Sequence, residues 1–323
     1  MPKLLITTIQ YKERGPFLFT GIFQNDRLLE ADLSDTARDS LVGNIYVARV
    51  LKVQASIHGA FVRLADKTKA FLPTRDIDKA LFVKKLSEKP IVQDELLVVQ
   101  VKKDAHGDKD AMVSPVVSLS ESLKTKAAHA AEGSLLSAAP PYYEKLLASL
   151  PEDAFSEILT DDPQLYEKLH AVFPQARLYT DSYGLDKLYA IEVQLEKALH
   201  KKIYLPSGGN LVIEQTEMCV CIDVNSSRQD AKKDKQEFLL QLNLEAAKEI
   251  AFQLRLRNLS GMILIDFVHM TDEAGKSTLI HAVKSLIKDD RIRTEYVDMT
   301  GLGLMELTRK RIRRTLAEQI FSD

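Results

Sequence analysis

Three polar residues stand near the ends of two apolar runs in the C-terminal third of the chain. Asp223 and Asn225 close the run that starts at Met218, and Asp266 lies near the end of the run that starts at Met262. On a strand, Asp223 and Asn225 would project from the same face. Two carboxylates and an amide oxygen suit a hard cation such as Mg²⁺ better than Zn²⁺, and a bound cation offsets the cost of burying carboxylates. Such a set supports hydrolysis of a phosphodiester by an activated water.

A plainer interpretation of the same residues stays open. Asp223 and Asp266 could be ordinary strand-end residues that cap loops or helices, and the Asp-x-Asn spacing does not decide between the two interpretations.

A βαβ unit would position the three polar residues. Between the two runs, residues 236–256 place apolar side chains at steps of three and four, which predicts one apolar stripe on a helix. The stripe consists of Leu239, Leu242, Ala246, Ile250 and Leu254. Strand, helix and strand in this order predict two parallel strands with a right-handed crossover. Ligands of open α/β sheets bind outside the carboxyl ends of the strands, where these residues stand.

The pattern of the N-terminal part of the chain predicts short strands. Residues 3–33 alternate apolar and polar, and five more short strands between residues 43 and 117 match the size of a small closed barrel of the OB type. Residues 122–140 are rich in Ala and Ser, which predicts a linker or a weak helix. Helical and strand patterns then alternate up to a last helix that we expect from Met305. An all-β part followed by an α/β part indicates at least two domains.

Residues within the predicted barrel provide a second clue to function. Between Arg49 and Lys109, 13 Lys or Arg stand against 8 Asp or Glu. Tyr46, Phe61 and Phe71 lie on three successive predicted strands, and aromatic residues on a basic barrel surface are typical of single-stranded nucleic acid binding. Each aromatic residue could equally belong to the core.

Basic residues outside the barrel are candidates for phosphate contacts. They are Arg228 in the loop after Asn225, and Arg309, Lys310, Arg311, Arg313 and Arg314 on the predicted last helix. A solvated surface explains them as well.

Composition excludes several classes of protein. The 323 residues carry 44 basic and 46 acidic side chains, a net charge of −2, which excludes a wholly basic nucleic-acid coat but leaves room for a locally basic face. No apolar run approaches the ~18 residues of a membrane span, and the N-terminus lacks the features of a signal peptide. Cys219 and Cys221 are too few for a disulfide framework, so we expect a soluble, cytoplasmic protein without membrane contact.

Motifs in a fixed order resemble those of the ribonuclease E/G family. The C-terminal ones are residues 205–209 (LPSGG), 216–217 (TE), 222–226 (IDVNS), 243–247 (NLEAA), 253–257 (QLRLR) and 261–270 (GMILIDFVHM). The N-terminal ones are residues 44–46 (NIY), 59–62 (GAFV) and 71–73 (FLP), which are similar to the family's S1-type RNA-binding domain.

This resemblance implies an α+β multidomain fold. An S1-type OB barrel (residues 37–118) is inserted into an RNase H-like subdomain (1–36 and 137–200), and a DNase I-like α/β catalytic subdomain (201–323) follows. Residues 119–136 would form a linker where the family usually has a segment that senses the 5′-monophosphate of the substrate.

The resemblance also implies site residues and a reaction. Asp223 and Asp266 match the family's metal-binding aspartates, and Asn225 matches the asparagine that orients the attacking water or the phosphate. Phe61, Phe71, Lys103 and Lys109 match residues of the RNA-binding barrel. The implied reaction is cleavage of single-stranded, typically A/U-rich RNA in RNA processing or decay. It depends on Mg²⁺, with Mn²⁺ as an alternative, and leaves a 5′-phosphate and a 3′-hydroxyl.

Three departures from the family pattern carry expectations of their own. The missing sensor segment predicts cleavage that does not depend on the 5′ end. The sequence ends at Asp323 without the family's Cys-x-x-Cys zinc link, so we expect no structural zinc, a buried structural role for Cys219 and Cys221, and a monomer or a small homo-oligomer not built on zinc. His269 stands where the family usually has an acid; it could tune the site or simply end a strand.

Two other functions remain as alternatives. One is a non-catalytic RNA-binding protein on the same scaffold, for which the joint presence of Asp223, Asn225 and Asp266 would have no physical purpose. The other is a nuclease that acts on DNA, because discrimination through 2′-hydroxyl contacts cannot be seen in a sequence.

Overall fold

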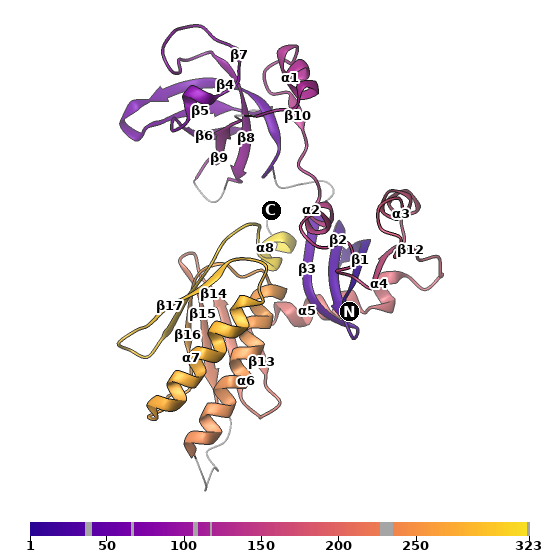
Figure 1. Cartoon of the computed structure of the whole chain (residues 1–323), viewed down its shortest axis with the longest axis vertical. Coiled ribbons are helices and arrows are strands. Elements are labelled where there is room, and N and C mark those ends of the chain that lie inside the picture. The colour runs from indigo at the N-terminus through magenta and orange to yellow at the C-terminus, as the bar shows by residue number, and fades with distance from the viewer. Residues whose placement is uncertain (36–40, 66–67, 106–108, 117, 227–234, 322–323) are drawn as a thin grey trace. The chain divides into compact units, whose positions relative to one another are not determined.

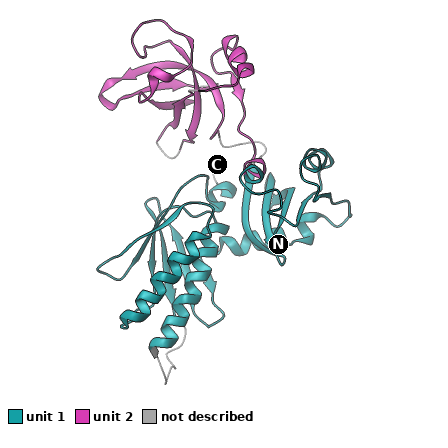
Figure 2. Ribbon diagram, viewed as in Figure 1, with its two compact units in different colours: residues 1–37, 146–323 teal, residues 38–145 magenta. Residues whose placement is uncertain are grey.

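The computed structural model describes residues 1–35, 41–65, 68–105, 109–116, 118–226 and 235–321 (Figure 1). The chain divides into two compact units, one formed by residues 1–37 and 146–323 and the other by residues 38–145 (Figure 2). The second unit is thus inserted into the first in sequence. Among the described residues, no helix is both long and apolar enough to cross a bilayer.

The first unit contains a five-stranded sheet in the order β12-β11-β1-β2-β3. Strands β1 to β3 are antiparallel, and β11 and β12 add in parallel beside β1. The strands are Lys3–Tyr11 (β1), Arg14–Gln24 (β2), Arg27–Asp35 (β3), Glu157–Thr160 (β11) and Ala176–Leu178 (β12). The accompanying helices are Pro163–His170 (α3), Leu185–Leu188 (α4) and Ile191–Leu199 (α5), and the helix Tyr142–Ala148 (α2) crosses the boundary between the two units. Buried aromatic and leucine side chains of β1–β3 pack against α5 and the C-terminal helix Leu316–Phe321 (α8).

The second unit is a closed barrel. Five of its strands run in the order β4-β5-β6-β9-β8, and β8 pairs back with β4, which closes the ring. The strands are Ile45–Gln54 (β4), Gly59–Arg63 (β5), Lys69–Pro73 (β6), Leu96–Lys103 (β8) and Ala111–Pro115 (β9), and Phe82–Lys84 (β7) extends the sheet beside β8. Short 3₁₀ turns occupy Ala55–Ile57 and Ile77–Lys79. A closed five-stranded barrel agrees with the predicted OB-type fold.

The segment expected to be a linker is folded onto this barrel. It contains the helix Glu121–Ala128 (α1), and the strand Leu135–Ser137 (β10) pairs with β4. Ala127 and Leu136 are buried against Val47 and Val98 of the barrel. A few apolar side chains in an Ala- and Ser-rich stretch are therefore enough to hold it in place, which composition does not reveal.

The first unit also contains a six-stranded sheet in the order β13-β14-β15-β16-β18-β17. The strands are Lys202–Tyr204 (β13), Asn210–Gln215 (β14), Cys219–Asn225 (β15), Gly261–Asp266 (β16), Thr294–Met299 (β17) and Met305–Arg309 (β18). The helices Lys235–Leu256 (α6) and Glu273–Lys288 (α7) pack on one face, where the apolar residues of β14–β16 and β18 form the core (Figure 1). The predicted βαβ unit is confirmed: β15 and β16 are parallel and α6 connects them.

The prediction of a helix that begins at Met305 is wrong. Residues 305–309 form β18, in which Met305, Leu307 and Arg309 are buried and the residues between them are half-buried. This alternation has the period of a strand, and antiparallel pairing on both sides with β16 and β17 stabilises it. The last described helix is α8.

Candidate functional site

Two carboxylates meet on the face of the six-stranded sheet that the helices do not cover. Asp223 of β15 and Asp266 of β16 are direct partners in the parallel register, and both side chains are exposed. Neighbouring strands lie about 4.8 Å apart, so the two side chains stand next to each other. The apolar alternation of both strands causes this placement: Ile222, Val224 and Ile265 point into the core, which leaves the aspartates outside.

Asn225 completes a trio with the two aspartates. Its Nδ2 donates a hydrogen bond of 2.7 Å to Oδ2 of Asp223, which holds that carboxylate in one orientation. The backbone of Asn225 is in turn tightly packed by the turn between β13 and β14. A Cβ added to Gly209 would lie 2.8 Å from the carbonyl oxygen of Asn225, so only glycine fits this turn without a shift.

A buried asparagine supports the chain just after Asp266. Asn243 of α6 is fully buried, its Nδ2 donates to the carbonyl oxygen of Val268 at 2.8 Å, and its Oδ1 accepts from the Val268 N–H at 3.0 Å. This two-bond contact holds the loop between β16 and α7. Sequence reasoning did not single out Asn243, although its position in the apolar stripe of a helix was a signal, because a polar residue there is stable only with buried partners.

The donor set fits a magnesium ion. Asp223 and Asp266 would hold the cation through oxygen, and Mg²⁺ typically uses one or two carboxylates together with waters and substrate phosphates. Within the described ranges, no group of three or more His, Cys, Asp or Glu could hold a metal. A fully protein-made metal cage, which zinc prefers, is therefore absent from the described part.

The two cysteines of β15 lie on the same face of the sheet as Asp223 and Asp266. Their Sγ atoms are 3.6 Å apart; Cys219 is buried and Cys221 is exposed, which corrects the expectation that both are buried. The hydrogen bond with Cys219, together with partial burial, raises the pKa of the Cys221 thiol.

His269 and Arg228 complete the candidates near the aspartates. His269 is exposed in the loop between β16 and α7. Arg228 lies outside the described residues.

A row of outward side chains crosses the barrel. In register, the row consists of Lys52 (β4), Phe61 (β5), Phe71 (β6), Met112 (β9) and Lys103 (β8). The rings of Phe61 and Phe71 meet edge to face with centroids 5.7 Å apart, and both are half-buried. Phe71 lies over Gly59, where a Cβ would come within 2.2 Å of the ring. The row is an apolar platform with a lysine at each end.

Lys52 was not predicted because β4 contains a bulge. The register of β4 with β5 shifts between Val50 and Lys52, so Lys52 points outward although strict alternation would place it on the side of the buried Val50. Lys109, the remaining predicted barrel lysine, is exposed just before β9.

A second outward row lies beside the first and is basic. It consists of Arg49 (β4), Arg63 (β5) and Lys69 (β6). Arg49 and Arg63 share Glu132 of the segment after the barrel, with N–O distances of 3.2 Å and 2.6 Å. The barrel therefore carries an aromatic row and a partly neutralised basic row side by side.

Tyr46 does not belong to this surface. Its side chain is 5% exposed and lies in the barrel core, where its hydroxyl accepts a hydrogen bond from Asn44 Nδ2 at 3.2 Å. The expectation of a base contact at Tyr46 is corrected, because β4 turns this ring inward.

The expectation of a phosphate contact at Arg309 is also wrong. It is 2% exposed at the end of β18, where its Nε lies 2.7 Å from Asp290 Oδ2 and its Nη1 donates to Asn258 Oδ1 at 3.0 Å. A guanidinium held in this way is not available to a phosphate. Arg311 is exposed and forms an ion pair with Glu318 at 2.9 Å.

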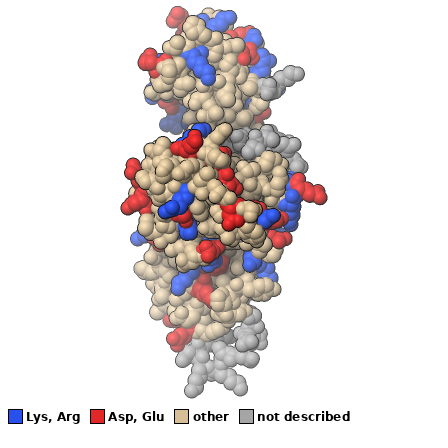
Figure 3. All heavy atoms as spheres, turned by 90° about the vertical axis from the view of Figure 1, so that its right-hand side faces the viewer, with Lys and Arg blue, Asp and Glu red and all other residues tan. Residues whose placement is uncertain are grey.

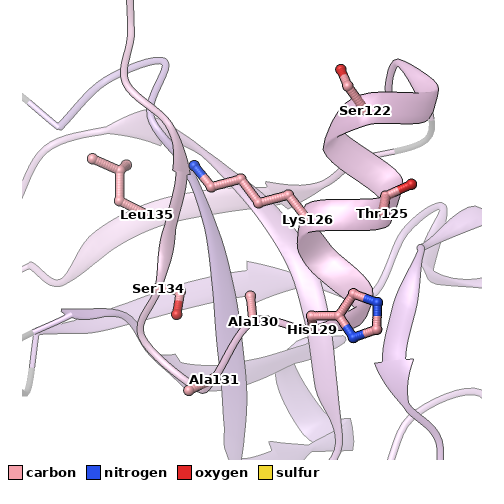
Figure 4. Close-up of a pocket in the computed structure, with 8 residues that line it drawn as sticks. All are labelled: Ser122, Thr125, Lys126, His129, Ala130, Ala131, Ser134 and Leu135. Carbon is pink, nitrogen blue, oxygen red and sulfur yellow. The ribbon is translucent and has the colours of Figure 1, made fainter.

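Two further features lie on the described surface. On the face drawn in Figure 3, acidic and basic side chains are interspersed rather than gathered by sign. An open hollow of about 800 Å³ lies between α1 and β10 in the barrel unit (Figure 4). Its only charged lining residue, Lys126, donates from Nζ to the carbonyl oxygen of Leu136 at 2.7 Å, and none of the predicted site residues lines it.

Comparisons with known proteins point to one family. The profile of the Ribonuclease E/G family matches residues 102–312. Ribonuclease E of Escherichia coli is 40% identical over 142 residues, which are 44% of this chain and 13% of that protein. Ribonuclease E of Haemophilus influenzae is 39% identical over 45% of this chain and 15% of its own length. Ribonuclease G of Escherichia coli is 36% identical over 43% of this chain and 28% of its own length. The chain thus covers well under two thirds of these relatives.

Proposed function

The chain belongs to the ribonuclease E/G family, and from this membership we propose that it is an endoribonuclease that cleaves single-stranded RNA with the help of Mg²⁺. The products we propose are a 5′-phosphate and a 3′-hydroxyl, and the proposed place of action is RNA processing or decay in the cytoplasm. A preference for A/U-rich RNA is part of the proposal.

One observation carries this proposal. Asp223 and Asp266 are register partners on two parallel strands, on an uncovered sheet face, with Asn225 bonded to one of them. Two adjacent carboxylates offer their oxygens to one cation, and Mg²⁺ is typically held by one or two carboxylates together with waters and substrate phosphates. An exposed site of this kind admits a large polymeric substrate from solvent.

The residues have distinct roles in the proposed reaction. A bound Mg²⁺ would lower the pKa of a water and stabilise the charge that develops on the phosphate. Asp223 and Asp266 would hold the ion. Asn225 keeps Asp223 in one orientation through its Nδ2, and we propose that its Oδ1 accepts from the attacking water or a ribose hydroxyl. Asn243 acts through the backbone of Val268 and keeps the end of β16 in place.

The barrel would bind the RNA strand. Phe61 and Phe71 offer faces on which bases stack, and Lys52 and Lys103 add positive charge at the two ends of the row. We propose that this barrel is the S1-type domain, that the five-stranded sheet belongs to an RNase H-like subdomain and that the six-stranded sheet is the DNase I-like subdomain.

We also propose that cleavage does not depend on the 5′ end of the RNA. The support comes from the stretch that stands where the family usually has its 5′-sensing segment. Here residues 121–137 contain α1 and β10, and both elements pack onto the barrel.

The test is cleavage of a short fluorescent A/U-rich RNA in Mg²⁺ and in EDTA. The substrate is prepared with a 5′-phosphate, with a 5′-hydroxyl and as DNA. Asp223→Asn and Asp266→Asn are each expected to abolish cleavage and to leave RNA affinity largely unchanged. Asp298→Asn is the matched control, because this exposed aspartate of β17 undergoes the same substitution elsewhere on the same sheet.

Each outcome of this experiment has one meaning. Cleavage that needs Mg²⁺, survives in Asp298→Asn and disappears in both site variants supports the nuclease. Full activity in either site variant contradicts the site. Tight RNA binding without any cleavage favours the alternative, a non-catalytic RNA-binding protein, and equal rates on both 5′ ends support cleavage without 5′ sensing.

A further inference from the structure

The uncovered face of the six-stranded sheet extends beyond the aspartates toward an edge strand. Ile203 of β13 packs toward the core, so its neighbours Lys202 and Tyr204 project from the opposite face, the one that carries Asp223 and Asp266. Tyr204 is 75% exposed. Nothing in the proposed cleavage chemistry uses this ring.

The register of the strands places Tyr204 in line with the site. Tyr204 pairs with Asn210, and Asn210 pairs with Asn225, so these three side chains form one row across β13, β14 and β15. The adjacent row runs from Lys202 through Val212 to Asp223 and on to Asp266. Two strand spacings of about 4.8 Å separate β13 from β15, so the tyrosine lies about 10 Å from the strand of the metal-binding pair.

The β13–β14 hairpin, which carries Tyr204, is held in place by backbone contacts. The turn from Leu205 to Gly209 is closed by backbone bonds between these two residues and between Gly208 and Leu205. Gly209 packs against the backbone of Asn225, which ties the hairpin to the site. Lys202 places its Nζ 5.2 Å from the centre of the Tyr204 ring. The result is an aromatic face with a cation beside it, two strands away from the strand that carries Asp223.

We propose that Tyr204 is the stacking partner of a nucleobase close to the cleaved phosphodiester, with Lys202 facing the RNA backbone next to it. This inference rests on the proposed function, because the carboxylate pair on the same face identifies RNA as the occupant. A stacked base fixes which phosphate reaches the aspartates, so Tyr204 would set the position of the cut. Stacking tolerates any base, so Tyr204 would position the strand without selecting the base.

The test combines tyrosine variants with abasic substrates. Single abasic nucleotides are introduced at each of the positions that flank the main cleavage site of the RNA. For the wild-type protein, an abasic nucleotide at one position is expected to lower kcat/KM about tenfold, within the range for one lost stack. Tyr204→Ala should show the same loss on intact RNA and no further loss at that position. Tyr204→Phe and Tyr204→Trp should restore cleavage.

The matched control is Tyr183→Ala, which removes another exposed tyrosine, in the loop between β12 and α4. It is expected to behave as the wild type on every substrate. If Tyr204→Ala cuts at the same place and rate, with an unchanged abasic profile, the inference is wrong while the nuclease stands.

A binding readout separates this inference from the proposed function. In the Asp223→Asn background, RNA with a photoreactive 4-thiouridine near the cleavage site should crosslink to residues 202–204, and the crosslink should disappear with Tyr204→Ala. If this crosslink forms but the wild-type protein does not cut RNA, the stacking site stands and the nuclease is rejected. If no crosslink forms although the wild-type protein cuts RNA, the stacking site alone is rejected.

Discussion

At the residue scale, the site depends on groups that hold the acidic side chains rather than on the acids alone. Asn225 orients Asp223 by a hydrogen bond of 2.7 Å, and Asn243 holds the backbone two residues after Asp266. Both asparagines act through geometry. Gly209 also contributes to the geometry of the site. Because it has no side chain, the β13–β14 turn can contact the carbonyl oxygen of Asn225.

Gly209→Ala is predicted to damage both the fold and the site. The new Cβ would lie 2.6 Å from Leu242 Cδ1 and 2.8 Å from Asn225 O, and relieving this overlap is expected to cost about 1–3 kcal/mol in the free energy of unfolding. Urea denaturation measures that cost, and RNA cleavage should fall because Asn225 shifts. Gly301→Ala is the control, because a Cβ there meets nothing within 4 Å; an equal effect of both variants would contradict the argument.

At the scale of secondary-structure elements, buried charges tie loops and strand ends to their neighbours. Arg309 joins β18 to the end of α7 through Asp290, and Glu95 closes the loop between β7 and β8. Each is fully or nearly fully buried, and each has several hydrogen-bond partners. These contacts are structural, since their donors and acceptors are already occupied.

Removing one partner of the Arg309–Asp290 pair should destabilise the first unit strongly. Asp290→Ala leaves a buried guanidinium without its counter-charge, and such a loss typically costs about 3–5 kcal/mol. Glu295→Ala is the control, because it breaks the exposed pair with Arg293, where less than about 1 kcal/mol is expected. Denaturant midpoints of both variants measure the difference, and similar midpoints would refute the structural role of Arg309.

Glu95 should make the barrel sensitive to acid. Burial alone would raise the pKa of its carboxyl, but hydrogen bonds from the N–H groups of Leu86 and Val92 and from Lys85 outweigh burial and lower the pKa below 4.5. The unfolded chain then binds the proton more readily than the folded one. Stability from Glu95 is therefore fully present above about pH 4.5 and is lost as the pH falls through the lower, folded-state pKa.

The measurement for Glu95 is urea denaturation at pH 7 and at about pH 3. Glu95→Gln should be less stable than the wild type at pH 7, and the difference should shrink on acidification. A constant difference at both pH values would show that ionisation of Glu95 plays no part.

At the scale of the whole molecule, the two candidate surfaces belong to different compact units. The aromatic row lies in the unit of residues 38–145, and the aspartate pair lies in the unit of residues 1–37 and 146–323 (Figure 2). The units meet in sequence only at the two crossings near residues 37 and 146. This division predicts that binding and cleavage are separable by mutation.

Phe61→Ala is predicted to weaken RNA binding by about 1–3 kcal/mol, the usual loss for one stacked base, and to leave kcat at saturating RNA unchanged. Asp223→Asn should abolish cleavage and leave the RNA affinity largely unchanged. Because the two residues belong to different compact units and Asp223→Asn alone leaves the affinity largely unchanged, the affinity of the double variant should equal that of Phe61→Ala alone. Fluorescence anisotropy measures the affinity and single-turnover cleavage measures the rate. An unchanged Kd for Phe61→Ala would show that this ring packs in the barrel and does not contact RNA.

The βαβ unit and the convergence of Asp223, Asn225 and Asp266 could be read from the sequence, because local periodicity determines which strand faces are buried. The barrel was also predictable as a set of short strands. Pairing between distant strands decided the rest. A bulge in β4 turns Lys52 outward and places it beside Phe61, pairing with β16 and β17 makes residues 305–309 a strand, and burial against Asp290 removes Arg309 from the surface. The row that links Tyr204 to Asn225 likewise exists only across three strands. Face and register depend on contacts between residues far apart in the chain, and no local pattern encodes them.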